Sequence, residues 1–288
     1  MQVIEQQTFP EERALYRLSD AHVLYSTFET GESPIKEAHD ALFEHCLFKW
    51  RYPVWYSQRI DLAHCTIYAD ARAGVWYCED VRITDSSIAA PKCIRRCKNT
   101  TLSHVSIPNG VETCWHCDGL DMHDVSIVGD YFCMNSENIR IDGLELTGKY
   151  SFDGVRHVDI CNAHMVTKDA FWNSEDVYVR DSVILGEYIG WNSKNITFEN
   201  CVIDSLQGLC YIDGVRLINC RLGNTSFAFE YSVVDATVHG RIDSVFNPTS
   251  GRIEADAIGE LIMEKDKATE GSVDILAQVE RRSDKPTW

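Results

Sequence analysis

The chain has 288 residues, of which 44% are hydrophobic and 25% are charged, and its formal net charge is -17. This composition can bury a large core, whereas so acidic a surface repels the phosphate groups of nucleic acids and anionic membranes. No apolar stretch approaches the roughly 20 residues of a membrane-spanning helix, and Met1–Pro10 lacks the pattern of a secretory signal. We therefore expect a cytoplasmic protein with no nucleic-acid partner and no membrane partner.

Residues 1–40 precede the first clear repeat. Ala21 stands where one further repeat would begin, but the segment Ser33–Ala38 interrupts the strand pattern. Solenoids need covered ends, because an open parallel edge invites aggregation. We therefore predict that residues 1–40 form an N-terminal cap.

Residues 41–240 repeat with a period of 19 to 21 residues. Positions 1, 3, 6 and 8 of a repeat are apolar, or small as at Ser182; Val177, Val179 and Ile184 are examples. Spacings of two indicate short strands, because apolar residues of a helix recur every three or four positions. The repeats begin at Ala41, Ile60, Val81, Thr100, Leu120, Ile139, Val158, Val177, Ile196, Val215 and Val234.

Two columns of bend residues stand in register with the apolar columns. They lie at the last position and at the fifth position of each repeat, and most of their members are Asn, Asp or Gly. These residue types tolerate the left-handed backbone region, so both columns predict bends with positive φ. The columns are Asn99, Gly119, Asn138, His157, Asp176, Asn195 and Gly214, and Asp85, His104, Asp124, Gly143, Asn162, Asp181, Asn200 and Asn219.

A third short strand is predicted near the end of each repeat, as at Ala170–Trp172 and Ile189–Trp191. Three strands joined by bends make one coil, and stacked coils pair as parallel strands. The sequence therefore predicts an all-β fold, a single-stranded right-handed parallel β-helix of about 10–12 coils with N- and C-terminal caps. The alternative is a left-handed hexapeptide helix with about 18 residues per coil. The longer and uneven unit of this chain favours the right-handed form.

The rhythm changes after Gly240. A strand over Ile242–Val245, a turn over Asn247–Gly251 and a strand over Arg252–Ala255 are predicted. We assign residues 241–288 to C-terminal strands and a tail, within one domain in all.

The 12 cysteines include a Cys-x-x-Cys motif at Cys114–Cys117, which is a spacing found in zinc and redox sites. No second such motif completes a four-ligand site. Buried cysteine behaves as a small hydrophobic residue, so we predict core cysteines and neither a metal nor a cofactor. The repeat places Cys46, Cys65, Cys201 and Cys220 at position 6, and Cys78, Cys97 and Cys117 three residues before a repeat start.

A column rich in tryptophan lies five residues before each repeat start. The residue before each member is apolar, so strand alternation predicts that the tryptophans point outward. Indole rings can stack on sugar rings, and basic residues pair with uronate carboxylates. The alternatives are that a loop covers the column or that it faces the core. The column is Trp55, Trp76, Arg95, Trp115, Met134, Asp153, Trp172 and Trp191.

Charged residues accompany this column and supply candidate catalytic groups. Carboxylates one or two coils apart would have backbones about 4.8 or 9.6 Å apart, which brackets the separations used by glycosidases. Asp153 could act as a general acid, and Lys92 or Arg95 could act as the base of a β-elimination. Surface ion pairs, such as Lys92 with Glu112, are the alternative. The predicted catalytic residues are Asp153, Glu112, Lys92 and Arg95, and the predicted substrate-binding residues are Trp76, Trp115, His116, Lys168, Asp169, Trp172, Glu187 and Trp191.

Eight motifs stand out along the chain, namely Glu32–Ala38, Tyr52–Trp55, Ala90–Lys92, Glu112–Cys117, Tyr150–Phe152, Lys168–Asn173, Gly186–Trp191 and Asn247–Gly251. Together they resemble a bacterial family of uncharacterised proteins, the domain of unknown function 3737. The resemblance covers nearly the whole chain and implies a right-handed β-helix similar to pectin lyases. The family has no established activity, so it implies no catalytic residue, and no cluster of aspartates matches the calcium site of pectate lyases.

Two functions remain open at this point. The first is a carbohydrate-active enzyme, like a glycoside hydrolase or polysaccharide lyase, or a carbohydrate-binding protein, acting on an oligosaccharide along the aromatic face. The second is a non-enzymatic solenoid scaffold for protein interaction or self-association as a homo-oligomer. An enzyme should have a cleft in which carboxylates or basic residues converge beside the indoles.

Overall fold

The structure is a computed structural model that describes residues 1–267 and 272–286. The chain divides into two compact units, Met1–Gly148 and Lys149–Trp288, and each is described by itself. All regular elements assigned in the described ranges are strands. None of the described residues belongs to a helix that could span a membrane.

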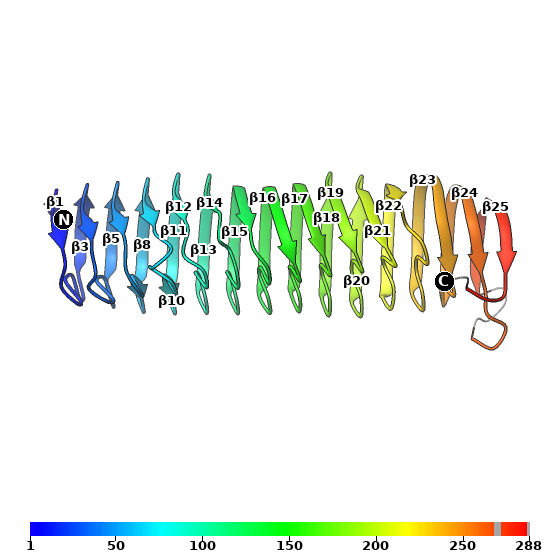
Figure 1. Cartoon of the computed structure of the whole chain (residues 1–288), viewed down its shortest axis with the longest axis horizontal. Coiled ribbons are helices and arrows are strands. Elements are labelled where there is room, and N and C mark those ends of the chain that lie inside the picture. The colour runs from blue at the N-terminus through cyan, green and yellow to red at the C-terminus, as the bar shows by residue number, and fades with distance from the viewer. Residues whose placement is uncertain (268–271, 287–288) are drawn as a thin grey trace. The chain divides into compact units, whose positions relative to one another are not determined.

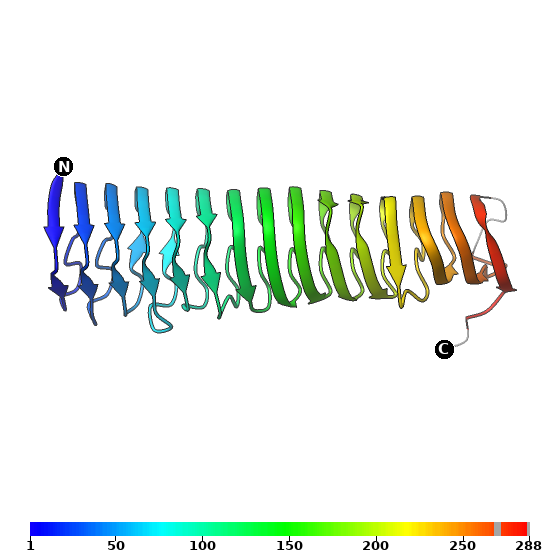
Figure 2. The same ribbon diagram turned by 90° about the horizontal axis from the view of Figure 1, so that it is seen from above.

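Unit 1 is a parallel β-helix of eight coils (Figures 1 and 2, blue to green). Each coil contributes one longer strand, and neighbouring longer strands pair in parallel, as in Ala21↔Ala41 and Val81↔Thr100. These strands are β1 Gln2–Glu5, β3 Ser19–Leu24, β5 His39–Glu44, β8 Gln58–Ala63, β11 Glu79–Thr84, β13 Lys98–Ser103, β15 Asp118–Val128 and β16 Glu137–Lys149.

Short strands form the other sides of the coils in unit 1. The second side pairs in parallel between coils, as in Phe28↔Phe48. It comprises β2 Thr8–Phe9, β4 Thr27–Phe28, β6 Leu47–Phe48, β9 Thr66–Ile67, β12 Ser87–Ile88 and β14 Ser106–Ile107, and the third side has β7 Val54–Trp55 and β10 Val75–Trp76.

Unit 2 has the same kind of coil, seven in all among its described residues, with longer and merged strands. Pairing is again parallel, as in Val177↔Ile196 and Ala236↔Ile253. The strands are β17 Arg156–Lys168, β18 Glu175–Arg180, β19 Val183–Glu187, β20 Lys194–Glu199, β21 Val202–Leu206, β22 Asp213–Gly223, β23 Val233–Phe246, β24 Ser250–Ile262 and β25 Val273–Ser283.

The predicted parallel β-helix is therefore confirmed, and so are both bend columns. Every residue of the two columns has positive φ, from 47° at Asp85 to 88° at Gly214. The apolar columns between them are buried, as at Val177, Val179 and Ile184. Bends at fixed positions thus hold the inward columns in register from coil to coil.

The first and last coils differ from the predicted caps. Residues 1–40 are not a separate cap, because β1 to β4 pair with the coils that follow. Their apolar column continues through Ala21, Val23 and Phe28, which are at most 1% exposed. The segment Ser33–Ala38 is one corner of a coil, with Ile35 and Ala38 buried.

The described residues beyond 240 also form paired strands of the β-helix. The predicted strands over 242–245 and 252–255 are parts of β23 and β24, which pair in parallel along most of their length. Residues 268–271 and 287–288 of the predicted tail lie outside the described residues. The eight and seven coils of the two units therefore exceed the predicted 10–12, since both end segments carry coils.

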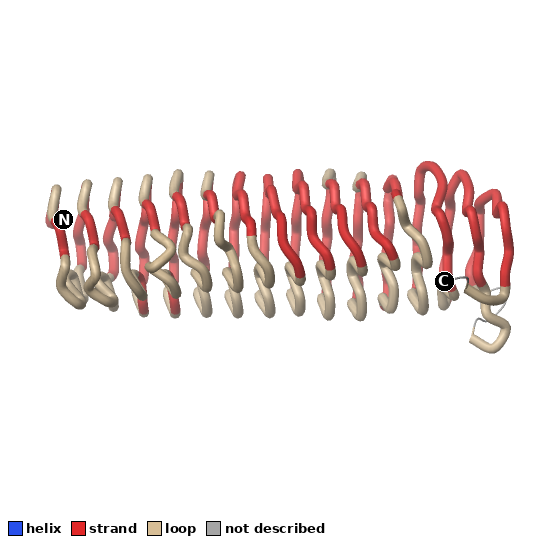
Figure 3. Tube along the Cα trace, viewed as in Figure 1, coloured by secondary structure: helices blue, strands red, loops and turns tan. Residues whose placement is uncertain are grey.

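The third strand forms in only part of the chain. It is present as β7 and β10, and isolated bridges continue it from Trp76 to Arg95 and from Arg95 to Trp115. Figure 3 shows this side of the coils mostly as turns. At the predicted strand over 170–172, positive φ at Asp169, Phe171 and Asn173 breaks the extended backbone.

Cysteine and serine share the same corner of the core, which confirms the predicted core cysteines. All 12 cysteines are free and buried. Cys97 Sγ donates to Val75 O at 3.5 Å and to Arg95 O at 3.3 Å, and Ser136 Oγ donates to Cys114 O at 2.7 Å. Either side chain thus satisfies a carbonyl of the preceding coil. No group of three or more His, Cys, Asp or Glu residues in the described ranges is placed to hold a metal ion.

Candidate functional site

The predicted site residues divide between the two units. Six lie in unit 1 and six in unit 2, and we call these sets the unit 1 cluster and the unit 2 cluster. The unit 1 cluster is Trp76, Lys92, Arg95, Glu112, Trp115 and His116, and the unit 2 cluster is Asp153, Lys168, Asp169, Trp172, Glu187 and Trp191.

The tryptophan column points away from the core. The preceding residues Val75, Cys114 and Phe171 are 0% exposed, whereas Trp76 and Trp115 are half-buried. The alternative that the column faces the core is therefore wrong.

The outward indoles of unit 1 stack on one another. The rings of Trp55 and Trp76 are nearly parallel, with an interplanar angle of 3° and centroids 5.4 Å apart. Their Nε1–H groups donate to backbone carbonyls of the next coil, Ala73 O at 2.7 Å and Lys92 O at 2.8 Å. The facing ring surfaces cover each other, so this pair offers mainly edges to a ligand.

Arg95 takes the place of an indole in the same column. Its guanidinium carbon lies 4.3 Å from the ring centroid of Trp115 and 5.4 Å from that of Trp76. Its side chain is only 15% exposed. Cation–π contacts of a desolvated guanidinium are attractive, so Arg95 joins the two halves of the aromatic column.

Glu112 is held by two cations of unit 1. Its Oε2 forms an ion pair with Arg95 Nη2 and lies 3.2 Å from Lys92 Nζ. Burial alone would raise the pKa of this carboxyl, but hydrogen bonds to Arg95 and Lys92 outweigh burial and hold the pKa below its ordinary value. Glu112 is therefore an ionised anchor, and the expected ion pair with Lys92 is present.

An outer column of side chains borders the unit 1 cluster. Tyr56 and Tyr77 stack with centroids 4.9 Å apart, and Arg96 and His116 follow them. Arg96 is exposed and has no ion pair among the described residues. Burial, with Arg96 and Arg95 nearby, lowers the pKa of His116. The sequence analysis missed the two tyrosines, although their place directly after the tryptophan column was a usable signal.

The unit 2 cluster repeats the indole stack. The rings of Trp172 and Trp191 have centroids 5.7 Å apart and an interplanar angle of 8°. Their Nε1–H groups donate to Tyr188 O at 2.7 Å and to Gln207 O at 2.6 Å. These indoles are tied to the next coil in the same way as those of unit 1.

The charged residues of the unit 2 cluster make separate contacts. Asp153 accepts a hydrogen bond from Asn173 Nδ2 at 2.9 Å, and Asn192 Nδ2 donates in turn to Asn173 Oδ1 at 2.7 Å. Lys168 Nζ pairs with Glu187 Oε2 at 2.7 Å. Asp153 thus stands at the end of an asparagine ladder, while Lys168 and Glu187 form an ion pair.

Two carboxyls of unit 2 have a raised pKa. Burial raises the pKa of Asp169, which is 3% exposed, and Lys168 offsets this only in part. Burial also raises the pKa of Glu230, a residue that the sequence analysis missed. Burial and Glu230 raise the pKa of Tyr211 to about 12, and the Tyr211 ring lies 5.1 Å from that of Trp191. Tyr211 is therefore an aromatic neighbour of the indole stack.

The open hollows on the described coils include three whose positions bear on the site. One is in unit 1 beside Asn99 and Arg140, with a volume of about 270 Å³. Two are in unit 2, beside Tyr178 and Arg216 and beside Arg221 and His239, with volumes of about 430 and 380 Å³. None of these three hollows is lined by a residue of either cluster.

A family model described as "Protein of unknown function (DUF3737)" matches residues 2–276. The chain belongs to the DUF3737 family. A comparison with curated proteins finds no match to this DUF3737 chain.

Several solved structures are distantly similar to the DUF3737 chain, and three of them follow. The A-module of the Azotobacter vinelandii mannuronan C-5 epimerase AlgE4 is 10% identical, with a TM-score of 0.31 over 98% of this chain and 87% of that one. Trypsin-treated QnrB1, a plasmid-mediated fluoroquinolone resistance protein, is 14% identical, with a TM-score of 0.23 over 75% and 92%. The pentapeptide repeat protein HetL of Nostoc sp. strain PCC 7120 is 8% identical, with a TM-score of 0.20 over 76% and 92%. None of these likenesses assigns a function to this chain.

The two clusters of this DUF3737 chain therefore differ in chemistry. The unit 1 cluster gathers Lys92 and Arg95 around one ionised carboxylate, with Arg96 beside them. The unit 2 cluster has its charges engaged with one another or with amides. The first arrangement suits an anionic ligand, and the second suits the cohesion of the coils.

Proposed function

We propose that this protein is a non-catalytic solenoid that binds an acidic oligosaccharide at the unit 1 cluster. The observation that carries the proposal is a group of three cations: Lys92 and Arg95 both pair with Glu112, and the exposed Arg96 follows Arg95 directly in the chain. Such a local excess of positive charge stands out in a chain with a net charge of -17. Short oligosaccharides fit better than plant polymers, because the expected location is the cytoplasm.

The contacts favour recognition by charge. Arg95 is fixed between two indoles and Glu112, whereas Lys92 and Arg96 are exposed. Guanidinium and ammonium groups bind carboxylates through charge-assisted hydrogen bonds. The edges of Trp76 and Tyr77 would then border a sugar ring, since the mutual stacking of the indoles leaves little free ring surface.

The state of Glu112 favours binding without turnover. A general acid needs a carboxyl that is protonated near the working pH, and the pKa of Glu112 is held below its ordinary value. Lys92 Nζ lies 3.2 Å from the same carboxylate, so this side chain is already engaged in an ion pair.

Titration calorimetry with oligogalacturonate tests this function. The double variant Lys92→Ala and Arg96→Ala removes two exposed cations while leaving the Arg95–Glu112 pair in place. Its affinity should fall by about tenfold or more, because hydrogen bonds to charged groups are lost. Lys98→Ala is the matched control, since Lys98 is an exposed cation on strand β13 of the same coil, and its affinity should be unchanged.

The same samples separate this function from its alternatives. Formation of reducing ends or of unsaturated uronates would show that the protein is an enzyme and would contradict the proposal. Equal losses in the double variant and the Lys98→Ala control would remove the unit 1 cluster as the binding site. Absence of binding, together with concentration-dependent growth of the particle in light scattering, would favour the scaffold.

A further inference from the structure

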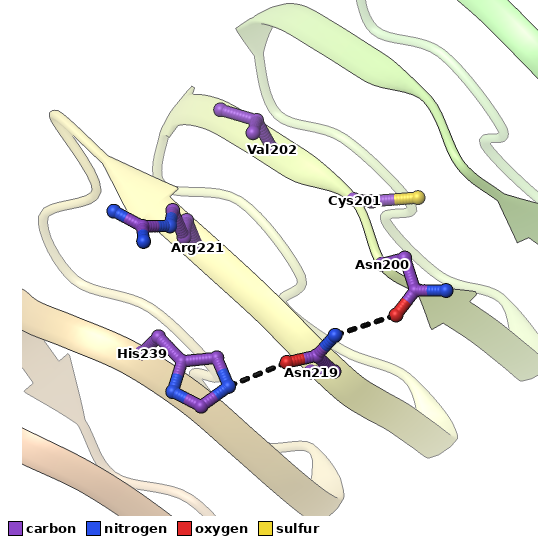
Figure 4. A pocket seen from close by; sticks show the side chains of 6 residues that line it. All are labelled: Asn200, Cys201, Val202, Asn219, Arg221 and His239. Carbon is purple, nitrogen blue, oxygen red and sulfur yellow. Dashed lines mark hydrogen bonds between the residues drawn. The ribbon is translucent and has the colours of Figure 1, made fainter.

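Unit 2 contains a hollow of about 380 Å³ that the proposed function does not use. Figure 4 shows it from close by, with side chains from three successive coils around it. It contains no residue of the unit 2 cluster. Its lining residues are Asn200, Cys201, Val202, Asn219, Arg221 and His239.

An amide ladder forms one wall of this hollow. Asn200 Nδ2 donates to Asp181 Oδ1 at 3.0 Å, and Asn219 Nδ2 donates to Asn200 Oδ1 at 2.6 Å. The ladder starts on a carboxylate, which only accepts hydrogen bonds when ionised. Every amide in it therefore points its nitrogen toward Asp181 and its oxygen the other way.

The direction of these hydrogen bonds determines which ring nitrogen of His239 carries a hydrogen. Its Nε2 contacts Asn219 Oδ1, as the dashed line in Figure 4 marks. An amide oxygen accepts and cannot donate, so Nε2 must carry a hydrogen. In the neutral ring the other nitrogen, Nδ1, is then an acceptor. The ladder also leaves the second N–H of Asn219 free to donate, because an amide nitrogen carries two hydrogens.

Arg221 lies on the strand next to that of His239, and its guanidinium has no charged partner among the described residues. The neighbouring residues Cys220 and Val238 are register partners on β22 and β23, so Arg221 and His239 lie on adjacent strands. Arg221 is exposed and makes neither an ion pair nor a side-chain hydrogen bond among the described residues. Arg216 on the same strand, in contrast, lies 3.5 Å from Asp235.

We propose that this hollow binds a small hydroxy-carboxylate, such as a free sugar acid. Arg221 pairs with the carboxylate, whose geometry matches a guanidinium. One hydroxyl of the ligand donates to His239 Nδ1, and a second hydroxyl accepts from the second N–H of Asn219. The C–H groups of the ligand lie against Val202, an apolar side chain that is 40% exposed. This site is separate from the unit 1 cluster and does not depend on its function.

The test titrates D-galacturonate into the full chain carrying Lys92→Ala and Arg96→Ala, so that the unit 1 cluster cannot mask the result. Saturable binding is expected, and acetate, which lacks hydroxyls, should bind at least about tenfold more weakly. Adding Arg221→Gln should weaken galacturonate binding about tenfold or more. Arg216→Gln is the matched control and should leave it unchanged.

A second variant and a spectroscopic readout address the imidazole. His239→Asn lengthens the amide ladder by one member while removing Nδ1, so the fold is retained and affinity should fall about fivefold. Nitrogen-15 correlation spectra should show the Nε2–H tautomer of His239 in the free protein. The proposal is overturned if galacturonate does not bind, if Arg221→Gln binds as tightly as its parent, or if His239 carries its hydrogen on Nδ1.

Discussion

Glu112 illustrates how one side chain couples the unit 1 cluster to pH. Its pKa lies below the ordinary value of 4.5, because the hydrogen bonds to Arg95 and Lys92 outweigh burial. A carboxyl with a lowered pKa stabilises the fold above its ordinary pKa and loses that contribution as the pH falls through the folded value. The contribution of Glu112 is therefore complete at neutral pH and disappears in acid.

We expect Glu112→Gln to lower the free energy of unfolding at pH 7 by about 1–2 kcal/mol, since Arg95 loses a charged partner while staying largely covered. The deficit should shrink as the pH is lowered toward about 4. Urea unfolding at several pH values, followed by circular dichroism, measures both quantities. A deficit that stays constant across this range would show that the carboxylate charge is not the cause.

Residue spacing predicted part of this site. The 19-residue period places Trp76 and Arg95 in one column, and the apolar residues before them predict the correct facing, since Val75 and Ile94 are buried. The period does not specify side-chain rotamers. The stacking of Trp55 on Trp76, and the hydrogen bonds from their indoles to the next coil, therefore could not be predicted.

Within the strands, two glycines show the difference between a steric clash and backbone strain alone. Gly251 lies near the start of β24 and has a φ of 113°. A Cβ at this position would lie 1.9 Å from Val234 O. Gly240 lies within β23 with φ of 95°, and nothing lies within 4 Å of its Cβ position. Both positions disfavour side chains, but only the first also has a carbonyl in the way.

We expect Gly251→Ala to destabilise the protein by about 3 kcal/mol or more, and Gly240→Ala by about 1 kcal/mol, because the second variant has strain without a clash. Thermal unfolding of both variants beside the parent protein measures the difference. Equal shifts of the two midpoints would contradict the role assigned to the Val234 carbonyl.

The ends of the ladder show where sequence patterns fail for whole elements. The segment Ser33–Ala38 contains a proline and two charged residues, and this composition predicts a break in the strand pattern. In the structure its apolar members Ile35 and Ala38 point into the core, and the remaining residues form the corner. A corner of a coil and a break in the repeat can have the same composition. The apolar residues Ala21 and Val23 earlier in the chain are the sequence feature that favours a corner, because they show that a coil is already present.

At the scale of the whole molecule, the core carries 12 thiols and exposes none of them. Thiols buried in apolar surroundings react slowly, because the reactive thiolate is disfavoured there. Burial raises the pKa of Cys93 to about 12 and that of Cys210 to about 12. Hydrogen bonds with neighbouring thiols lower the pKa of Cys46, Cys97 and Cys220, but these side chains are buried as well and a reagent cannot reach them. The native protein should therefore resist thiol reagents although its cysteine content is high.

We expect no fast-reacting thiol when the native protein is treated with a disulfide-exchange reagent, and reaction of all 12 thiols in guanidinium chloride. Ser106→Cys is the control, because Ser106 is exposed on β14 and should add one fast-reacting thiol. Absorbance of the released thiolate counts both classes. A fast-reacting thiol in the parent protein would mean that some coil opens or that a cysteine column is misplaced.

The stacked indoles also have an optical consequence. Unit 1 holds the Trp55 and Trp76 pair and unit 2 holds the Trp172 and Trp191 pair, each nearly parallel and closely spaced. Rings this close and this nearly parallel couple their transition dipoles, which shifts the near-ultraviolet absorption of each pair and lets excitation pass from one ring to the other. Each unit thus carries its own intrinsic chromophore pair, and the loss of that coupling reports the separation of two particular coils without any added dye.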